Sequence, residues 1–166
     1  MSKTQTLSKS GILTELEVQH FMSKLGVIIS IPYGDCERYD QIWDINGKIL
    51  RVQVKTSSLL DDESGISFPG KNTAGKYTND QIDGIATFYE GKCYFVPIDD
   101  CSNEIKLRFT LPKNSQVEHV KFAYDYEVNR IFDIYYNAPG TDVYTPVKRV
   151  KFSKQILKQE STTSLV

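Results

Sequence analysis

The hydrophobic and polar positions of the chain predict one amphipathic helix followed by short strands. Apolar residues recur at helical spacing from residue 8 to about residue 26, and Gly26 stands where a glycine commonly ends a helix. The β-branched run after it, closed by Pro32 and Gly34, predicts a strand and a turn. We expect the helix to bury a broad face made of Ile12, Leu13, Leu16, Phe21, Met22 and Leu25.

Residues 38–55, RYDQIWDINGKILRVQVK, predict a β-hairpin. Asn46-Gly47 is typical of a type I′ turn, which needs positive φ at both central residues. A two-residue loop pairs Ile45 with Lys48 and fixes all later pairs. One face then carries Tyr39, Gln41, Trp43, Leu50, Val52 and Val54, whereas the other sets Asp40 opposite Gln53 and Arg38 opposite Lys55.

The polar face of this hairpin has two interpretations. It is either the solvated side of a half-buried hairpin or a chemical site. Arg38 opposite Lys55 is a like-charge pair, which costs stability unless a phosphate or carboxylates lie nearby. Asp40 and Gln53 offer two hard oxygen ligands for a divalent cation, within reach of the Lys55 ammonium. This outlines a site for phosphodiester hydrolysis that lacks one acidic group.

The remaining segments are mainly β-structure and polar connections. Residues 57–81 are rich in Ser, Asp, Gly and Asn and predict a long functional loop, with room for a short strand at Ile-Ser-Phe. Residues 83–98 predict two strands around a turn at Glu90-Gly91, and residues 105–111 another strand. Residues 120–135 fit a strand or a helix. Residues 147–158 form a basic segment that is either a DNA contact or a solvated terminal stretch.

Composition limits the function classes. The chain has 166 residues, which predicts a single domain, and its 20 basic and 21 acidic residues require any DNA binding to come from local clusters. Cys36, Cys93 and Cys101 show no metal-binding spacing with His20 or His119, so we expect reduced thiols. The polar N-terminus and the absence of a long apolar run predict a cytoplasmic protein. We expect no membrane association and no organic cofactor.

Three short motifs occur in an order that resembles the PD-(D/E)XK nuclease superfamily. They are T-E-L-E-V with Glu15, R-Y-D with Asp40, and Q-V-K with Gln53 and Lys55. The likeness is to the small branch with archaeal Holliday-junction resolvases and group I intron homing endonucleases, over roughly residues 10–100. Helix geometry alone leaves Glu15 and Glu17 both open, and the family pattern selects Glu15. Gln53 replaces the commoner acidic residue, but its carbonyl oxygen can still bind a metal.

The resemblance implies an α/β fold with a restriction-endonuclease-like core, in which helices flank a central mixed β-sheet. The core is expected at about residues 8–100, with a C-terminal extension over 101–166. Glu15, Asp40, Gln53 and the main-chain carbonyl of Val54 are expected to hold Mg²⁺ or Mn²⁺. Lys55 is expected to orient or deprotonate the attacking water, giving 5′-phosphate and 3′-hydroxyl products.

Double-stranded DNA is the expected substrate, and a homodimer or homotetramer is expected because cutting two strands needs two sites. Asp35 and Asp44 are explained by turn capping and strand-edge solvation. We favour a site-specific homing or restriction-like endonuclease because the C-terminal extension would add DNA-reading surface. A junction resolvase and a silent DNA-binding scaffold are the alternatives. The residues expected to contact DNA are Arg38, Lys71, Lys76, Lys148, Arg149, Lys151 and Lys154.

Overall fold

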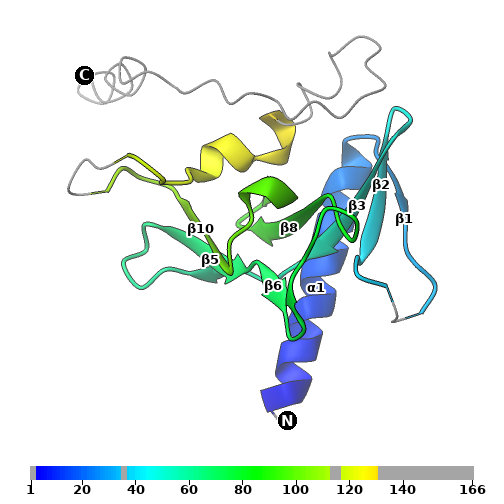
Figure 1. Ribbon diagram of the computed structural model, residues 1–166, viewed down its shortest axis with the longest axis horizontal. Helices are drawn as coiled ribbons and strands as arrows, with labels where there is room; N and C mark the ends of the chain where they lie inside the picture. Colours follow the sequence, from blue (N-terminus) through cyan, green and yellow to red (C-terminus); the bar gives the residue numbers. More distant parts are fainter. Residues whose placement is uncertain (1–2, 35–36, 113–116, 131–166) are drawn as a thin grey trace.

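The computed structural model describes residues 3–34, 37–112 and 117–130 (Figure 1). Its first element is the helix α1, Lys3–Lys24, which begins earlier than the sequence pattern predicted. The predicted end is confirmed, because Gly26 has a φ of 82°. The Gly26 N–H donates to Ser23 O at 3.0 Å and the Val27 N–H to Met22 O at 3.2 Å, the pair of bonds that a glycine after a helix commonly makes.

The predicted buried face of α1 is wrong in part. Val18 and Met22 are fully buried, but Ile12, Leu13 and Leu16 are more than half exposed. At 100° per residue, Leu13 and Leu16 lie on the side of the helix opposite Val18 and Met22. Both groups therefore cannot face the single sheet against which α1 packs.

A five-stranded sheet forms the centre of the protein, in the order β1-β2-β3-β8-β9. Strands β3 and β8 are parallel and all other neighbours in this sheet are antiparallel, which confirms the predicted mixed sheet. The predicted turn at Glu90-Gly91 joins β8 to β9. The strands are β1 (Ile28–Ser30), β2 (Gln41–Ile45), β3 (Lys48–Val54), β8 (Gly84–Tyr89) and β9 (Lys92–Pro97).

The β2–β3 hairpin has the predicted register from its turn to Gln41, which pairs with Val52. Asn46 and Gly47 have φ values of 53° and 85°, as a type I′ turn requires. Beyond Gln41 the pairing changes, because the Asp40 N–H donates to Val52 O at 2.9 Å. The ladder therefore ends at Gln41, and it lacks the three predicted strand pairs Asp40–Gln53, Tyr39–Val54 and Arg38–Lys55.

The predicted loop over residues 57–81 contains four short strands as well as irregular segments. The short strand at Ile-Ser-Phe is present as part of β5, Gly65–Pro69, where Ile66 and Phe68 are buried. This strand is longer than predicted because β5 pairs with a distant strand, β10, which gives these side chains a core to enter. The other elements are β4 (Ser58–Leu59), β6 (Lys71–Asn72), β7 (Gly75–Lys76), β10 (Glu104–Arg108) and the 3₁₀ helices η1 (Ile98–Asp100) and η2 (Ala123–Tyr126).

Two hydrophobic clusters cover the two faces of the central sheet. One packs α1 against the sheet through residues such as Val18, Met22 and Trp43. The other joins the opposite face to β5, β10 and η2 and includes Ile85 and Leu107. Figure 1 shows α1 and the β5–β10 pair on opposite sides of β8. In the described residues a small sheet thus covers the face where a second helix was expected.

The described part of residues 120–135 contains η2, and the rest of that segment lies outside the described residues, as does Cys36. Cys93 and Cys101 are free thiols, as expected, and burial raises the pKa of Cys101 to about 12. No helix in the described ranges is long and apolar enough to cross a lipid bilayer.

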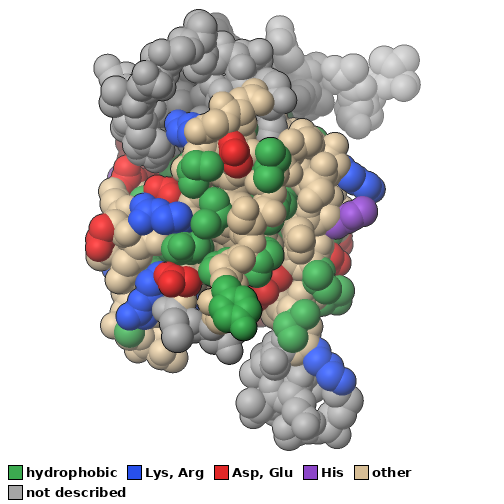
Figure 2. Space-filling view, turned by 90° about the vertical axis from the view of Figure 1, so that its right-hand side faces the viewer, with side chains coloured by type: hydrophobic (Ala, Val, Ile, Leu, Met, Phe, Trp, Pro, Cys, Tyr) green, Lys and Arg blue, Asp and Glu red, His purple; other side chains and the backbone are tan. Residues whose placement is uncertain are grey.

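The edge strand β1 lies on a partly apolar surface. Ile28 in β1 and Ile49 in β3 are more than half exposed, as is Ile31 just after β1. Figure 2 looks onto the molecule from the right-hand side of Figure 1, where β1 and β2 lie, and shows apolar side chains scattered among polar ones.

Gly84 offers a test of the packing between β8 and its antiparallel neighbour β9. A Cβ atom there would lie 2.4 Å from Phe95 Cζ and 2.6 Å from Val96 O. We therefore expect Gly84→Ala to lower the free energy of unfolding by about 1–3 kcal/mol in urea titrations. Gly11→Ala is the control, because no atom lies within 4 Å and helix propensity favours alanine by about 0.5–1 kcal/mol. Wild-type stability of Gly84→Ala would contradict this packing.

Candidate active site

The predicted site residues come from three places in the fold. Glu15 lies in the middle of α1, and Asp40 stands directly before β2. Gln53 and Val54 end β3, and Lys55 follows them. The Lys55 N–H donates to Ala86 O at 2.9 Å, so Lys55 is held beside the parallel strand β8. The site therefore lies at the carboxyl end of β3.

The Asp40 carboxylate is held by the end of β3. One oxygen, Oδ2, accepts the Val54 N–H at 2.7 Å and also accepts the Gln53 amide Nε2. The side chains of Asp40 and Gln53 thus meet, as the hairpin register predicted. Gln53 is only 9% exposed, so the alternative of a fully solvated polar face does not hold at this position.

Burial and like charge act on both acids. Burial raises the pKa of Glu15, the Asp40 charge raises it further, and the Lys55 ammonium lowers it. Burial also raises the pKa of Asp40, while its hydrogen bond with Val54 and the charge of Lys55 lower it. These charges interact because Glu15, Asp40 and Lys55 lie near one another. A cation would reduce the cost of keeping both carboxylates ionised.

The oxygen atoms at this site fit a hard divalent cation. Glu15 and Asp40 supply carboxylates, and the Val54 main-chain carbonyl supplies a neutral oxygen. The amide nitrogen of Gln53 is taken by Asp40, so its carbonyl oxygen is the atom suited to a metal. Within the described ranges, no group of three or more His, Cys, Asp or Glu side chains could hold a metal ion. The ligand set of Glu15, Asp40 and Gln53 contains two acidic side chains and one amide, which is fewer than three such groups.

A groove of about 560 Å³ runs from Lys55 along Pro69 to β6 and is also lined by Lys71, Asn72 and Thr73. The Lys55 ammonium lies 5.8 Å from the centre of the ring of Tyr77, the residue that follows β7. Lys71 stands opposite Lys76 in the β6–β7 hairpin. The groove therefore begins at the candidate site and reaches a positively charged hairpin.

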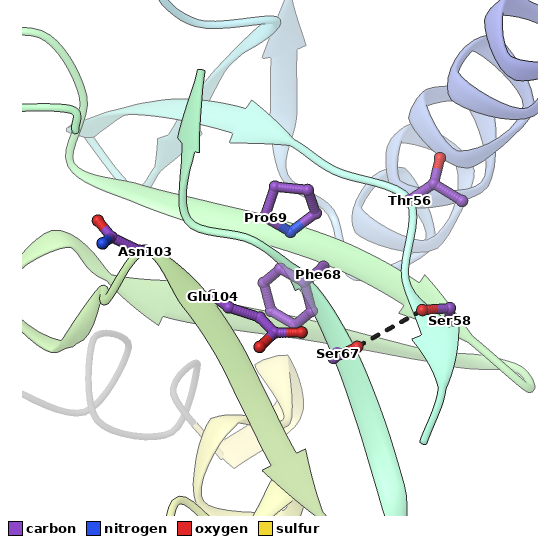
Figure 3. Close-up of a pocket in the computed structure, with 7 residues that line it drawn as sticks. All are labelled: Thr56, Ser58, Ser67, Phe68, Pro69, Asn103 and Glu104. Atoms are coloured by element: carbon purple, nitrogen blue, oxygen red, sulfur yellow. Dashed lines mark hydrogen bonds between the residues drawn. The ribbon is translucent and has the colours of Figure 1, made fainter. Parts of the chain in front are cut away.

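A second groove, of about 320 Å³, begins at Thr56 and shares Pro69 with the first. Figure 3 shows its lining, in which the hydroxyl groups of Ser58 and Ser67 face each other at 3.5 Å. Asn103 and Glu104 lie along its other side. This groove has hydroxyl, amide and carboxylate groups but no lysine or arginine in its lining.

Of the other residues predicted to contact DNA, the structure describes only Arg38. Arg38 is exposed and precedes the β2–β3 ladder. Lys148, Arg149, Lys151 and Lys154 lie outside the described residues, as does Asp35. Asp44 accepts the Gly47 N–H at 2.7 Å, which confirms that it caps the hairpin turn.

The sequence interpretation missed three groups that hold this site together. Gln41 was assigned only to the apolar face, although a glutamine among apolar residues is itself a signal of a buried hydrogen bond. The Thr14 and Thr56 hydroxyl groups lie 3.0 Å apart and link α1 to the residue after Lys55. Neither that pair nor the Lys55–Tyr77 contact has a recognisable sequence signal, because both join distant parts of the chain.

Comparisons with known proteins agree with this geometry. No curated protein sequence gives a significant match. Among solved structures, the bacterial homing endonuclease I-Ssp6803I is similar, with a TM-score of 0.59 and 22% identity over 81% of this chain and 94% of that chain. The likeness supports the predicted restriction-endonuclease-like fold. The sequence model of the PD-(D/E)XK endonuclease family matches residues 6–129, most of the chain, and the chain therefore belongs to that family.

Proposed function

We propose that this protein is a divalent-metal-dependent endonuclease that cuts double-stranded DNA at a specific site. The observation that carries the proposal is the Asp40 carboxylate, which is bound by Val54 and Gln53 and lies near Glu15 and Lys55. Membership of an endonuclease family and the oxygen ligands at this site support it. We place the catalytic core and the DNA-binding surface in one domain of a cytoplasmic protein.

Each side chain has a separate role in hydrolysis. Glu15, Asp40, Gln53 and the Val54 carbonyl would hold Mg²⁺ or Mn²⁺, which would stabilise negative charge on the scissile phosphate. Lys55 orients the attacking water and offsets charge at phosphorus. The water oxygen forms a bond to phosphorus while the bond to the 3′ oxygen breaks. The products carry a 5′-phosphate and a 3′-hydroxyl.

The groove beside Lys55 gives the DNA backbone a path toward β6. Lys71 and Lys76 are exposed cross-strand neighbours, and two like charges in that position destabilise the free hairpin. A phosphate group between them would remove this repulsion. We assign further phosphate contacts to Arg38 and to Lys148, Arg149, Lys151 and Lys154.

Both DNA strands can be cut only if two active sites meet one duplex. We propose a symmetric homodimer or homotetramer for this reason. The structural likeness to a bacterial homing endonuclease favours a long duplex target over a four-way junction. Preferential cleavage of a four-way junction would instead identify the protein as a resolvase. DNA binding without cleavage would identify it as a catalytically silent scaffold.

The first prediction concerns the charge of Glu15 in the absence of metal. Because the folded chain raises the pKa of Glu15, the folded state loses stability as the pH rises from the ordinary value of 4.5 through the raised pKa. At pH 7 we therefore expect Glu15→Gln to melt about 1–2 °C above the wild type. The difference in melting temperature should vanish below pH 4.5, where the Glu15 side chain is neutral in both the folded and the unfolded protein.

Magnesium gives the control for this prediction. Added Mg²⁺ should raise the melting temperature of the wild type and act less on Glu15→Gln, because a ligand that binds the folded state stabilises it. Equal melting temperatures for the two proteins at pH 7 without metal would contradict the charge assigned to Glu15.

The second prediction tests the enzyme itself. Cleavage of a long duplex that contains the target site should require Mg²⁺ or Mn²⁺ and stop in EDTA. Lys55→Met keeps both carboxylates, so metal and DNA should still bind while single-turnover cleavage slows by about 10²-fold or more. Asp40→Ala should weaken metal binding and cleavage together. Full cleavage in EDTA, or unchanged cleavage by Lys55→Met, would refute the proposed mechanism.

The third prediction concerns the β6–β7 hairpin. Lys71→Gln combined with Lys76→Gln should weaken binding to all duplexes and lower the slope of log affinity against log salt by about 2, one per phosphate contact. Lys24→Gln is the matched control. Lys24 lies in the last turn of α1, about 13 Å along the helix from Glu15. An unchanged slope in the double variant would remove the hairpin from the DNA contact.

A further inference from the structure

The side chain of Gln41 is a buried amide between α1 and the central sheet. It is 1% exposed and belongs to the first residue of β2, directly after Asp40. Its Nε2 donates to the main-chain carbonyl of Glu15 at 2.9 Å, and its Oε1 accepts the indole N–H of Trp43 at 2.9 Å. Both ends of the amide are therefore bonded, as burial of a polar group requires.

Trp43 determines which way this amide points. An indole nitrogen can only donate a hydrogen bond, so the atom of Gln41 that faces it has to be the carbonyl oxygen. The NH₂ group must then face the helix, where the Glu15 carbonyl accepts it. Trp43 is 1% exposed and packs 5.4 Å from the Phe95 ring, so the donor that orients Gln41 is itself held by the core.

The position of this hydrogen bond in the chain connects it to the candidate site. It joins the backbone of Glu15 to the residue next to Asp40, so it spans the two elements that supply the carboxylates. The hydroxyl contact between Thr14 and Thr56 lies one residue before Glu15 and one residue after Lys55. The helix is thus tied to the hairpin at two successive residues, 14 and 15.

We infer that Gln41 is a positioning residue, which sets the separation of the Glu15 and Asp40 carboxylates and thereby the affinity of the site for a divalent cation. The inference rests on the proposed metal-dependent function. An apolar residue could fill the same volume of core, but it could not hold the Glu15 carbonyl at a fixed distance from β2. Metal ligands commonly depend in this way on neighbouring hydrogen bonds that orient them.

Manganese binding to the full-length protein, followed by electron paramagnetic resonance without DNA, tests this inference independently of cleavage. Gln41→Met keeps the side-chain length and removes both hydrogen bonds, and we expect Mn²⁺ affinity to fall by about tenfold. Val18→Ala is the control, because Val18 is fully buried in the same helix–sheet contact and makes no polar contact there. It should lower the melting temperature while Mn²⁺ affinity changes less than twofold.

A double-mutant cycle separates positioning from general loosening of the core. If Gln41 acts through Glu15, Gln41→Met should change Mn²⁺ affinity less than twofold in a Glu15→Ala background, while its effect on melting temperature remains. Equal losses of affinity in both backgrounds would overturn the inference. Should Gln41→Met fail to fold, Gln41→Leu is a second apolar replacement that lacks both hydrogen bonds, and it should show the same tenfold loss.

The cycle also distinguishes this inference from the proposed function. If wild-type protein binds no Mn²⁺, the metal-dependent function fails and the inference fails with it. If the wild type binds Mn²⁺ and Glu15→Ala weakens that binding, but Gln41→Met and Gln41→Leu retain wild-type affinity, then only the role of Gln41 is refuted.

Discussion

The two-residue turn at Asn46-Gly47 is the constraint on which the candidate site depends. With both residues at positive φ, the turn allows one register for the two strands that it joins. A shift by one residue would move Trp43 to the opposite face and take its indole away from Gln41. The same shift would separate Asp40 from Gln53. The turn thus determines the contents of both faces, although it lies at the other end of the hairpin.

The two faces of the hairpin have different tasks at the end near Asp40. The apolar face packs against α1. Gln41 on this face fixes the position of Glu15 through its hydrogen bond to the Glu15 carbonyl. The other face presents Gln53 to Asp40, and the Val54 N–H holds the same carboxylate. Two half-buried acids are thereby kept close, and Lys55 lowers the cost of the repulsion between their charges. Under the proposed function, a bound cation would lower this cost further.

Features set by neighbouring residues were predictable from sequence, and features set by distant contacts were not. Gly26 marked the helix end and Asn46-Gly47 the register, because each acts through its own backbone conformation. The exposure of Ile12 and Leu16 was missed, since nothing local decides which side of an amphipathic helix meets the sheet. The full length of β5 and its pairing were not predictable, because its partner β10 lies about 40 residues away. The contact between the Asp40 and Gln53 side chains was predicted from the hairpin register, although the ladder itself ends at Gln41.

The β6–β7 hairpin has a consequence for how such a protein can change over evolutionary time. Its ladder has only two residue pairs, and none of the side chains from Lys71 to Lys76 is buried. Substitutions in it therefore disturb neither hydrophobic cluster and cost the fold little. The acids and Lys55 instead stand on elements that the core holds in place. Under the proposed function, the surface that contacts DNA could therefore change while the catalytic residues stay the same, and the scaffold could acquire new targets without losing its fold.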